Sequence, residues 1–244
     1  MTTYTNSKTA PESVLSLVSI SIAIFTEPKK ALSSIRQRGA AWLPLSIIVL
    51  SSVLLLILYY QNIDFSWVQD KLVESMKDPA ERDRARQIIS KKMLITSGVA
   101  STVAGIPIIF ALTSLYLFAV AKIKNIEISF GKWFAFVSWT SLPSLLLLPL
   151  GVLQIFMAKN GQLEFSQVNP VTLNSLFFQI ETGRNWSNLL DSFSLLTVWS
   201  LGLMILGLRD WANFSRSTST TVIVLPYAVI YGVWAVICAT SKTI

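Results

Sequence analysis

Residues 41–60 read AWLPLSIIVLSSVLLLILYY, twenty residues without a charged side chain. A helix of about 20 apolar residues crosses the ~30 Å hydrocarbon core of a bilayer. Trp42 near the start of this stretch and Tyr59 and Tyr60 at its end are typical of the two membrane–water interfaces. The stretch therefore predicts a first transmembrane span.

Four more long apolar runs follow it, at about 94–121, 133–157, 189–208 and 221–240. Of the 244 residues, 52% are hydrophobic and 14% are charged, against ~25% charged in soluble domains. We therefore predict an all-α membrane protein of about five transmembrane helices, with residues 41–244 as its membrane domain. Prolines inside three of these runs predict kinked helices: Pro107, Pro143, Pro149 and Pro226.

The polar segments predict surface helices and loops. Residues 1–40 form an N-terminal cytoplasmic or interfacial region, in which 12–38 read as two short helices joined at Pro28. The first is too short to span, so we expect it in the headgroup plane. Residues 61–93 predict a surface helical hairpin with a helix start at Asp78, and 158–187 predict a loop with a short helix across 173–180.

Catalytic chemistry is not expected. Histidine is absent, which removes the commonest general base and metal ligand, and Cys238 is the one cysteine. The sequence also lacks a glycine-rich phosphate loop and a pair of intramembrane acids. We predict no catalytic residue, no cofactor and no metal site.

The net charge of +7 does not indicate nucleic-acid binding, because the basic residues flank apolar runs instead of gathering with stacking aromatics. Contact with anionic lipid headgroups is the simpler interpretation. The expected partners are the lipid bilayer and either another membrane protein or a second copy of the chain.

Asp191 lies near the expected start of the fourth span. Three interpretations stay open: a cap on that helix N-terminus, a polar contact between helices, or part of an ion or proton pathway. Arg209 and Asp210 precede Trp211, and we expect an interfacial anchor there, with the indole at headgroup depth. Docking of a partner at this site is the alternative.

Lysine and arginine counts do not settle the orientation directly. With a cytoplasmic N-terminus, the inside segments 1–40, 122–132 and 209–216 carry ten basic residues, and the outside segments also carry ten. Seven of the outside ten lie in 61–93, where six acidic residues neutralise most of them. We therefore predict a cytoplasmic N-terminus.

The pattern Phe25-x-x-Pro28-x-x-Ala31, followed by Trp42-x-Pro44 at the first of five spans, resembles the bacterial branch of the Yip-domain family over roughly residues 20–240. Eukaryotic members interact with Rab GTPases in vesicle traffic and membrane shaping. Their Asp-Leu-Tyr-Gly-Pro signature is missing here, so Rab binding is not expected. The resemblance implies a bacterial inner-membrane protein with an outward C-terminus that self-associates or binds another protein.

Two functional classes remain. A non-catalytic membrane scaffold or trafficking-type protein acts through protein contacts, whereas a small transporter or channel needs polar residues along a path through several helices. The spans contain scattered Ser, Thr and Pro but only one ionisable side chain, Asp191. The scaffold class is therefore preferred.

Overall fold

The computed structural model describes residues 15–240 apart from 75 and 183. Five helical segments in this part of the chain are long and apolar enough to cross a membrane. They are α3 (Trp42–Asn62), α6 (Lys91–Ile123), α7 with α8 (Phe130–Thr140 and Leu147–Met157), α10 (Leu195–Ala212) and α11 (Arg216–Thr240). The prediction of an all-α protein with five spans is confirmed.

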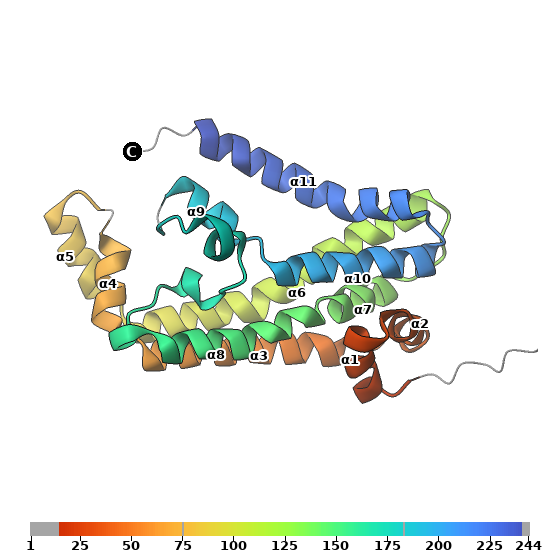
Figure 1. Cartoon of the computed structure of the whole chain (residues 1–244), viewed down its shortest axis with the longest axis horizontal. Helices are drawn as coiled ribbons and strands as arrows, with labels where there is room; N and C mark the ends of the chain where they lie inside the picture. The colour runs from red at the N-terminus through yellow and green to blue at the C-terminus, as the bar shows by residue number, and fades with distance from the viewer. Residues whose placement is uncertain (1–14, 75, 183, 241–244) are drawn as a thin grey trace, which may run out of the picture.

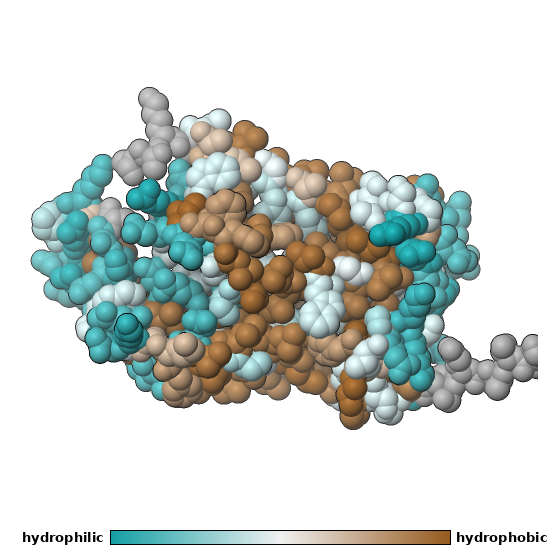
Figure 2. All heavy atoms as spheres, viewed as in Figure 1, coloured by the Kyte–Doolittle hydropathy of each residue, from teal (hydrophilic) through white to brown (hydrophobic). Residues whose placement is uncertain are grey.

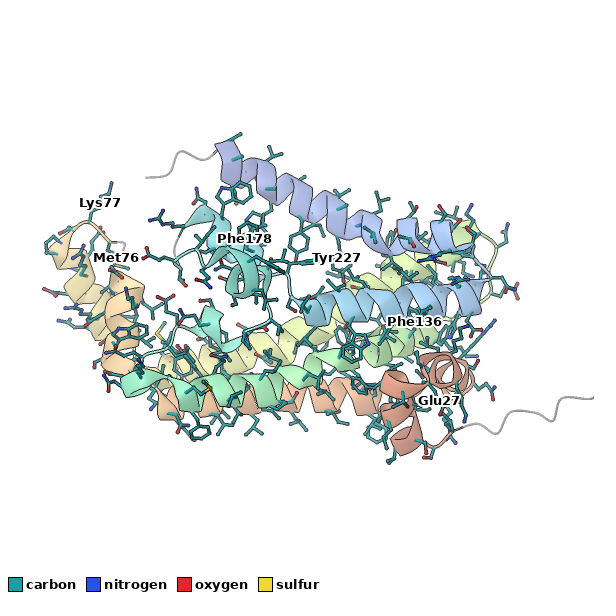
Figure 3. The ribbon with its side chains drawn as sticks, viewed as in Figure 1. Glu27, Met76, Lys77, Phe136, Phe178 and Tyr227 are labelled. Atoms are coloured by element: carbon teal, nitrogen blue, oxygen red, sulfur yellow. The ribbon has the colours of Figure 1, made fainter. Side chains whose placement is uncertain are left out.

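The long helices run side by side along the longest dimension of the molecule (Figure 1), with α3 packed on α6 and α8, and α10 packed on α7 and α11. The visible surface has an apolar middle and hydrophilic ends (Figure 2). Glu27 lies at one end, and Met76 and Lys77 lie at the other (Figure 3). We call the end with Glu27 the inner end and the other the outer end.

The third span is broken in its middle by a 3₁₀ segment, Leu142–Leu146, between α7 and α8. Pro143 stands at its start, where proline has no N–H to continue the α-helical pattern. Three hydroxyls around the break donate to carbonyls of the preceding turn: Thr140 to Phe136, Ser141 to Val137 and Ser144 to Ser141. The expected irregularity is therefore a change of helix type with its polar groups satisfied locally.

The fourth long helix begins later than predicted, at Leu195 instead of near residue 189. Ser194 caps it by accepting from the Thr197 N–H at 3.3 Å. Just before it, Phe193 O accepts from Leu173 N at 2.8 Å, and Leu195 N donates to Val171 O at 2.9 Å. These two bonds hold the backbone in an isolated bridge that separates α10 from the short helix α9 (Asn185–Asp191). The other four long helices agree with the expected runs to within a few residues.

Two short helices, α1 (Leu17–Thr26) and α2 (Pro28–Arg38), lie at the inner end and are joined at Pro28 as expected. Residues 1–14 of the predicted N-terminal region are outside the described residues. Helix α1 does more than lie in the headgroup plane, because Ile20 and Ile24 are fully buried in the main core. Its opposite face exposes Val18 and Ile22, at 70% and 63%. The helix therefore packs one apolar face on the bundle and leaves a second apolar face exposed.

The outer end carries the predicted surface hairpin, made of α4 (Phe65–Val73) and α5 (Pro79–Ile88) (Figure 1). Asp64 and Asp78 cap the two helices through their carboxylates. The 158–194 segment folds between α8 and α11 as short turns and α9. Its short elements are η2 (Lys159–Gly161), η3 (Phe165–Val168) and η4 (Asn174–Phe178).

Candidate functional site

An aromatic cluster at the inner end joins the α1–α2 hairpin to the spans. Trp211 of α10 lies 4.9 Å from Phe136 and 5.7 Å from Trp133, measured between ring centroids. The Trp211 indole N–H donates to Leu32 O of α2 at 3.0 Å. The Trp139 indole N–H donates to Ala40 O at 2.6 Å. One buried indole therefore holds α2 on the bundle, and the other holds the linker that follows α2.

Trp211 is 2% exposed, so its indole packs inside the protein and does not face lipid or water. Its expected depth at the headgroups stays a prediction. Hydropathy places a tryptophan at a span end near the headgroups, but the α2 helix covers this end of α10. Gly207, one turn earlier, permits the close approach: a Cβ there would stand 2.9 Å from Phe136 Cζ and 3.1 Å from Leu32 Cδ2.

Arg209 and Asp210 are exposed beside this cluster, at the last turn of α10. The Asp210 carbonyl accepts from Arg36 Nη1 at 3.4 Å, which adds a contact from α2. The two charged side chains face solvent and are available to water or headgroups. Whether they dock a partner stays a prediction.

Asp191 lies far from Arg209 and Asp210, because about 21 Å of helix separates the start of α10 from Arg209. It is the last residue of α9, so it does not cap the fourth span. Its Oδ1 accepts from Thr172 Oγ1 at 3.3 Å, while its Oδ2 is buried without a hydrogen-bond partner among the described residues. Asp191 therefore makes a polar contact between α9 and the loop that holds Thr172.

Burial raises the pKa of the Asp191 carboxyl above its ordinary value, while hydrogen bonds from Asn174 and Thr172 act in the opposite direction. The negative charge of Glu164 adds to the rise in pKa. One oxygen of Glu164 is also buried and without a partner within the described chain. The outer half thus holds two carboxyl groups that each have a buried, unpartnered oxygen, and the charge of Glu164 disfavours ionisation of Asp191.

Three residues of this outer polar centre were missed in the sequence: Glu164, Thr172 and Asn174. Thr172 is 1% exposed and Asn174 is 6% exposed, although both lie in a segment that reads as a polar loop. Asn174 bonds Ile180 through both its amide oxygen and its amide nitrogen. The Asn169-Pro170 turn signal was visible, but it does not reveal which neighbouring side chains become buried.

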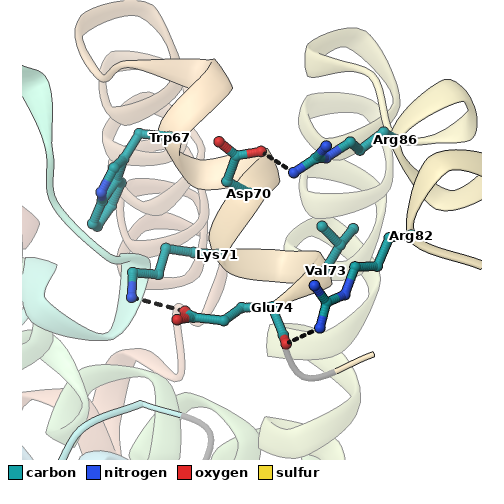
Figure 4. Close-up of a pocket in the computed structure, with 7 residues that line it drawn as sticks. All are labelled: Trp67, Asp70, Lys71, Val73, Glu74, Arg82 and Arg86. Carbon is teal, nitrogen blue, oxygen red and sulfur yellow. Dashed lines mark hydrogen bonds and ion pairs between the residues drawn. The ribbon is translucent and has the colours of Figure 1, made fainter. Parts of the chain in front are cut away.

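A pocket of about 270 Å³ lies between α4 and α5 at the outer end (Figure 4). Its charged groups bind one another: Asp70 pairs with Arg86 at 2.7 Å, Lys71 pairs with Glu74 at 2.8 Å, and Arg82 donates to Glu74 O at 3.4 Å. Within the described residues, no cluster of three or more Asp, Glu or Cys side chains is placed to hold a metal ion. The pocket is best explained as the inside of a surface hairpin.

These features define a polytopic, all-helical membrane protein with an N-terminal helical hairpin fixed on the inner end of five spans. The family model of the Yip1 domain matches residues 22–237, from within α1 to within α11. The chain therefore belongs to the Yip1 domain family, and the matched region includes the hairpin together with all five spans. No curated protein and no solved structure matches the chain.

Proposed function

We propose that this protein is a non-catalytic membrane scaffold that acts through contacts with another membrane protein or with further copies of itself. The observation that carries the proposal is how the spans use their polar groups. Three buried hydroxyls in the bundle bond carbonyls of their own helices, Ser114 to Phe110, Ser138 to Phe134 and Thr140 to Phe136. Ser219 Oγ in α11 is buried without a partner among the described residues. The three paired hydroxyls are satisfied within a helix, and one unpartnered hydroxyl does not make a polar path through several helices.

The positions of the charged residues support the same proposal. Lys91, Lys122, Lys132, Arg209 and Arg216 all stand in the first or last turns of the long helices. The middle of each described span is apolar or carries hydroxyls. A transporter usually places ionisable or polar groups near the bilayer midplane, so the scaffold class is favoured.

The two ends differ in charge, and this difference supports a cytoplasmic N-terminus. Among the described residues, the inner end has nine basic and three acidic residues, whereas the outer end has nine of each. The inner basic residues are Lys29, Lys30, Arg36, Arg38, Lys122, Lys124, Lys132, Arg209 and Arg216. The positive-inside rule counts Lys and Arg, which are equal in number at the two ends. The proposed cytoplasmic N-terminus therefore depends on the inner basic residues having fewer acidic neighbours, and on the family resemblance. We assign the protein to a bacterial inner membrane on this basis and on its resemblance to the bacterial branch of the family.

The test combines photo-crosslinking in native membranes with a flux assay in liposomes. A photoreactive residue replaces Ile230, which is 62% exposed on α11, and the control carries it at Leu203, which is 3% exposed on α10. The scaffold proposal predicts that the probe at Ile230 gives a protein adduct of constant mass and that the probe at Leu203 gives none. It also predicts no flux of ions or small solutes.

Solute flux that Asp191→Asn abolishes would instead favour the transporter alternative, because a pathway could use the buried, unpartnered carboxyl oxygen of Asp191. Crosslinks to lipid alone at every expression level would contradict action through protein contacts.

A further inference from the structure

A second hollow lies at the inner end, where α6 leads into α7. It is open, has a volume of about 450 Å³, and is lined by Phe118, Lys122, Glu127, Ile128, Ser129 and Phe130. Its size falls within the range of small-ligand sites. Because Lys122 ends one span and Phe130 begins the next, the hollow lies at the depth of the lipid headgroups.

The hollow presents two opposite charges that do not pair with each other. Lys122 and Glu127 are both exposed, and neither forms an ion pair with any described residue. In the outer pocket, by contrast, Asp70 and Arg86 neutralise each other. A ligand with one negative and one positive group would therefore meet both charges in the inner hollow.

The backbone between these charges is fixed. Asn125 adopts a left-handed conformation, with φ of 54°, after the end of α6. Its N–H donates to Lys122 O at 3.1 Å, and the Ile126 N–H returns to Ala121 O at 2.9 Å. This helix-ending turn holds Glu127 in place beside the last turn of α6.

The remaining walls are aromatic. The rings of Phe118 and Phe130 meet edge to face, with centroids 6.4 Å apart, and Phe130 is 40% exposed. Lys122 Nζ lies 5.5 Å from the centroid of Phe118. An ammonium group beside the half-buried ring of Phe118, next to the exposed ring of Phe130, suits a ligand that is ionic at one end and apolar at the other.

We propose that this hollow binds the headgroup of a zwitterionic phospholipid. Lys122 Nζ and Ser129 Oγ bind the phosphate, Glu127 accepts the ammonium group, and the first acyl carbons lie on Phe118 and Phe130. A purely anionic lipid satisfies Lys122 but is repelled by Glu127. The site therefore disfavours anionic lipids, although the positive charge of the inner end attracts them to this end of the protein.

The test is native mass spectrometry of the full chain in detergent, titrated separately with phosphatidylethanolamine and phosphatidylglycerol of identical acyl chains. Glu127→Gln should weaken ethanolamine-lipid binding about fivefold and strengthen glycerol-lipid binding, because one charge near the headgroup is worth about 1 kcal/mol. Lys122→Gln should weaken both lipids. Lys124→Gln is the matched control, since Lys124 has the same charge two residues away and is outside the hollow, and it should leave the ratio of the two affinities unchanged.

An unchanged ratio in Glu127→Gln, with unaltered thermal unfolding, would overturn the proposal. An equal effect of Lys124→Gln would do the same, because general surface charge would then explain the binding. Soluble glycerophosphoethanolamine should not compete at lipid concentrations; competition at equal strength would overturn the assignment to a membrane lipid.

Discussion

Trp211 determines whether the N-terminal hairpin stays on the bundle, because it combines full burial with a hydrogen bond to α2. We expect Trp211→Phe to lower the free energy of unfolding by about 1–3 kcal/mol, through the lost bond to Leu32 O and the smaller ring. Thermal unfolding in detergent measures this loss. Trp42→Phe is the control: Trp42 is 63% exposed, and its substitution should change stability by less than about 0.5 kcal/mol. Equal losses in both variants would contradict the role given to Trp211.

Gly207 supplies the space for this contact. Gly207→Ala should cost about 1–3 kcal/mol, because the added methyl group meets Phe136 and Leu32. Gly202 lies on the same helix with nothing within 4 Å of an added Cβ, so Gly202→Ala should be neutral or slightly stabilising. The difference in melting temperature between the two variants measures the effect. If the Gly207→Ala protein were as stable as the Gly202→Ala protein, α2 and α10 would be less closely packed than described here.

The Asp191 carboxyl should make the free energy of unfolding fall as the pH rises. Burial raises its pKa in the folded state above the ordinary value of 3.8, so folding favours the protonated form. The contribution of Asp191 to the free energy of unfolding is therefore largest below about pH 4. It falls as the pH rises through the folded-state pKa. Asp191→Asn removes the charge and should raise the melting temperature at pH 7 by about 1–3 °C.

The advantage of Asp191→Asn should shrink as the pH falls from 7 to 4, measured by thermal unfolding at each pH. Asp210→Asn, at an exposed carboxylate, is the control and should show little effect. A melting-temperature difference between Asp191→Asn and wild type that does not vary with pH would contradict the account of this buried group.

At the scale of helices, the α4–α5 hairpin depends on polar contacts, since α5 has no buried residue. The Gln69 amide nitrogen donates to Arg86 O at 2.6 Å and to Ile89 O at 2.8 Å. Gln69→Ala should therefore speed amide exchange across α5 about tenfold, the effect of two lost hydrogen bonds. Hydrogen exchange with mass spectrometry measures it. Lys71→Gln breaks only the ion pair between α4 and its C-cap residue Glu74, and it should leave α5 unchanged. Equal acceleration in both variants would contradict this attachment.

Uninterrupted apolar length was enough to predict all five spans, because lipid requires it of any helix that crosses. Apolar length alone did not place the start of the fourth span. Leu189 and Leu190 are as apolar as Leu195 and Leu196, and the break between them comes from backbone bonds to residues 171 and 173. Such bonds depend on tertiary structure.

The candidate site was predicted less well for the same reason. Asp191 was recognisable as an acid beside an apolar run, but its partners Thr172 and Asn174 lie in a loop whose course the sequence does not reveal. Trp211 was assigned to the interface because a span end usually meets headgroups. Its burial depends on α2 packing there, which helical periodicity alone does not indicate.

For the whole molecule, the account depends on its two ends lying on opposite sides of a membrane. The inner end holds the α1–α2 hairpin and the excess of positive charge, and the outer end holds the α4–α5 hairpin (Figure 1). Gln37 of α2 and Gln87 of α5 are a matched pair of exposed, uncharged residues on these two hairpins. Each can be replaced by cysteine in a Cys238→Ser background.

The most direct measurement is labelling of Gln37→Cys and Gln87→Cys with a membrane-impermeant maleimide in right-side-out vesicles. We predict that position 87 is labelled in sealed vesicles and that position 37 is labelled only after permeabilisation. Labelling of both positions in sealed vesicles would contradict the crossing of the first span, and labelling of position 37 alone would contradict the cytoplasmic N-terminus.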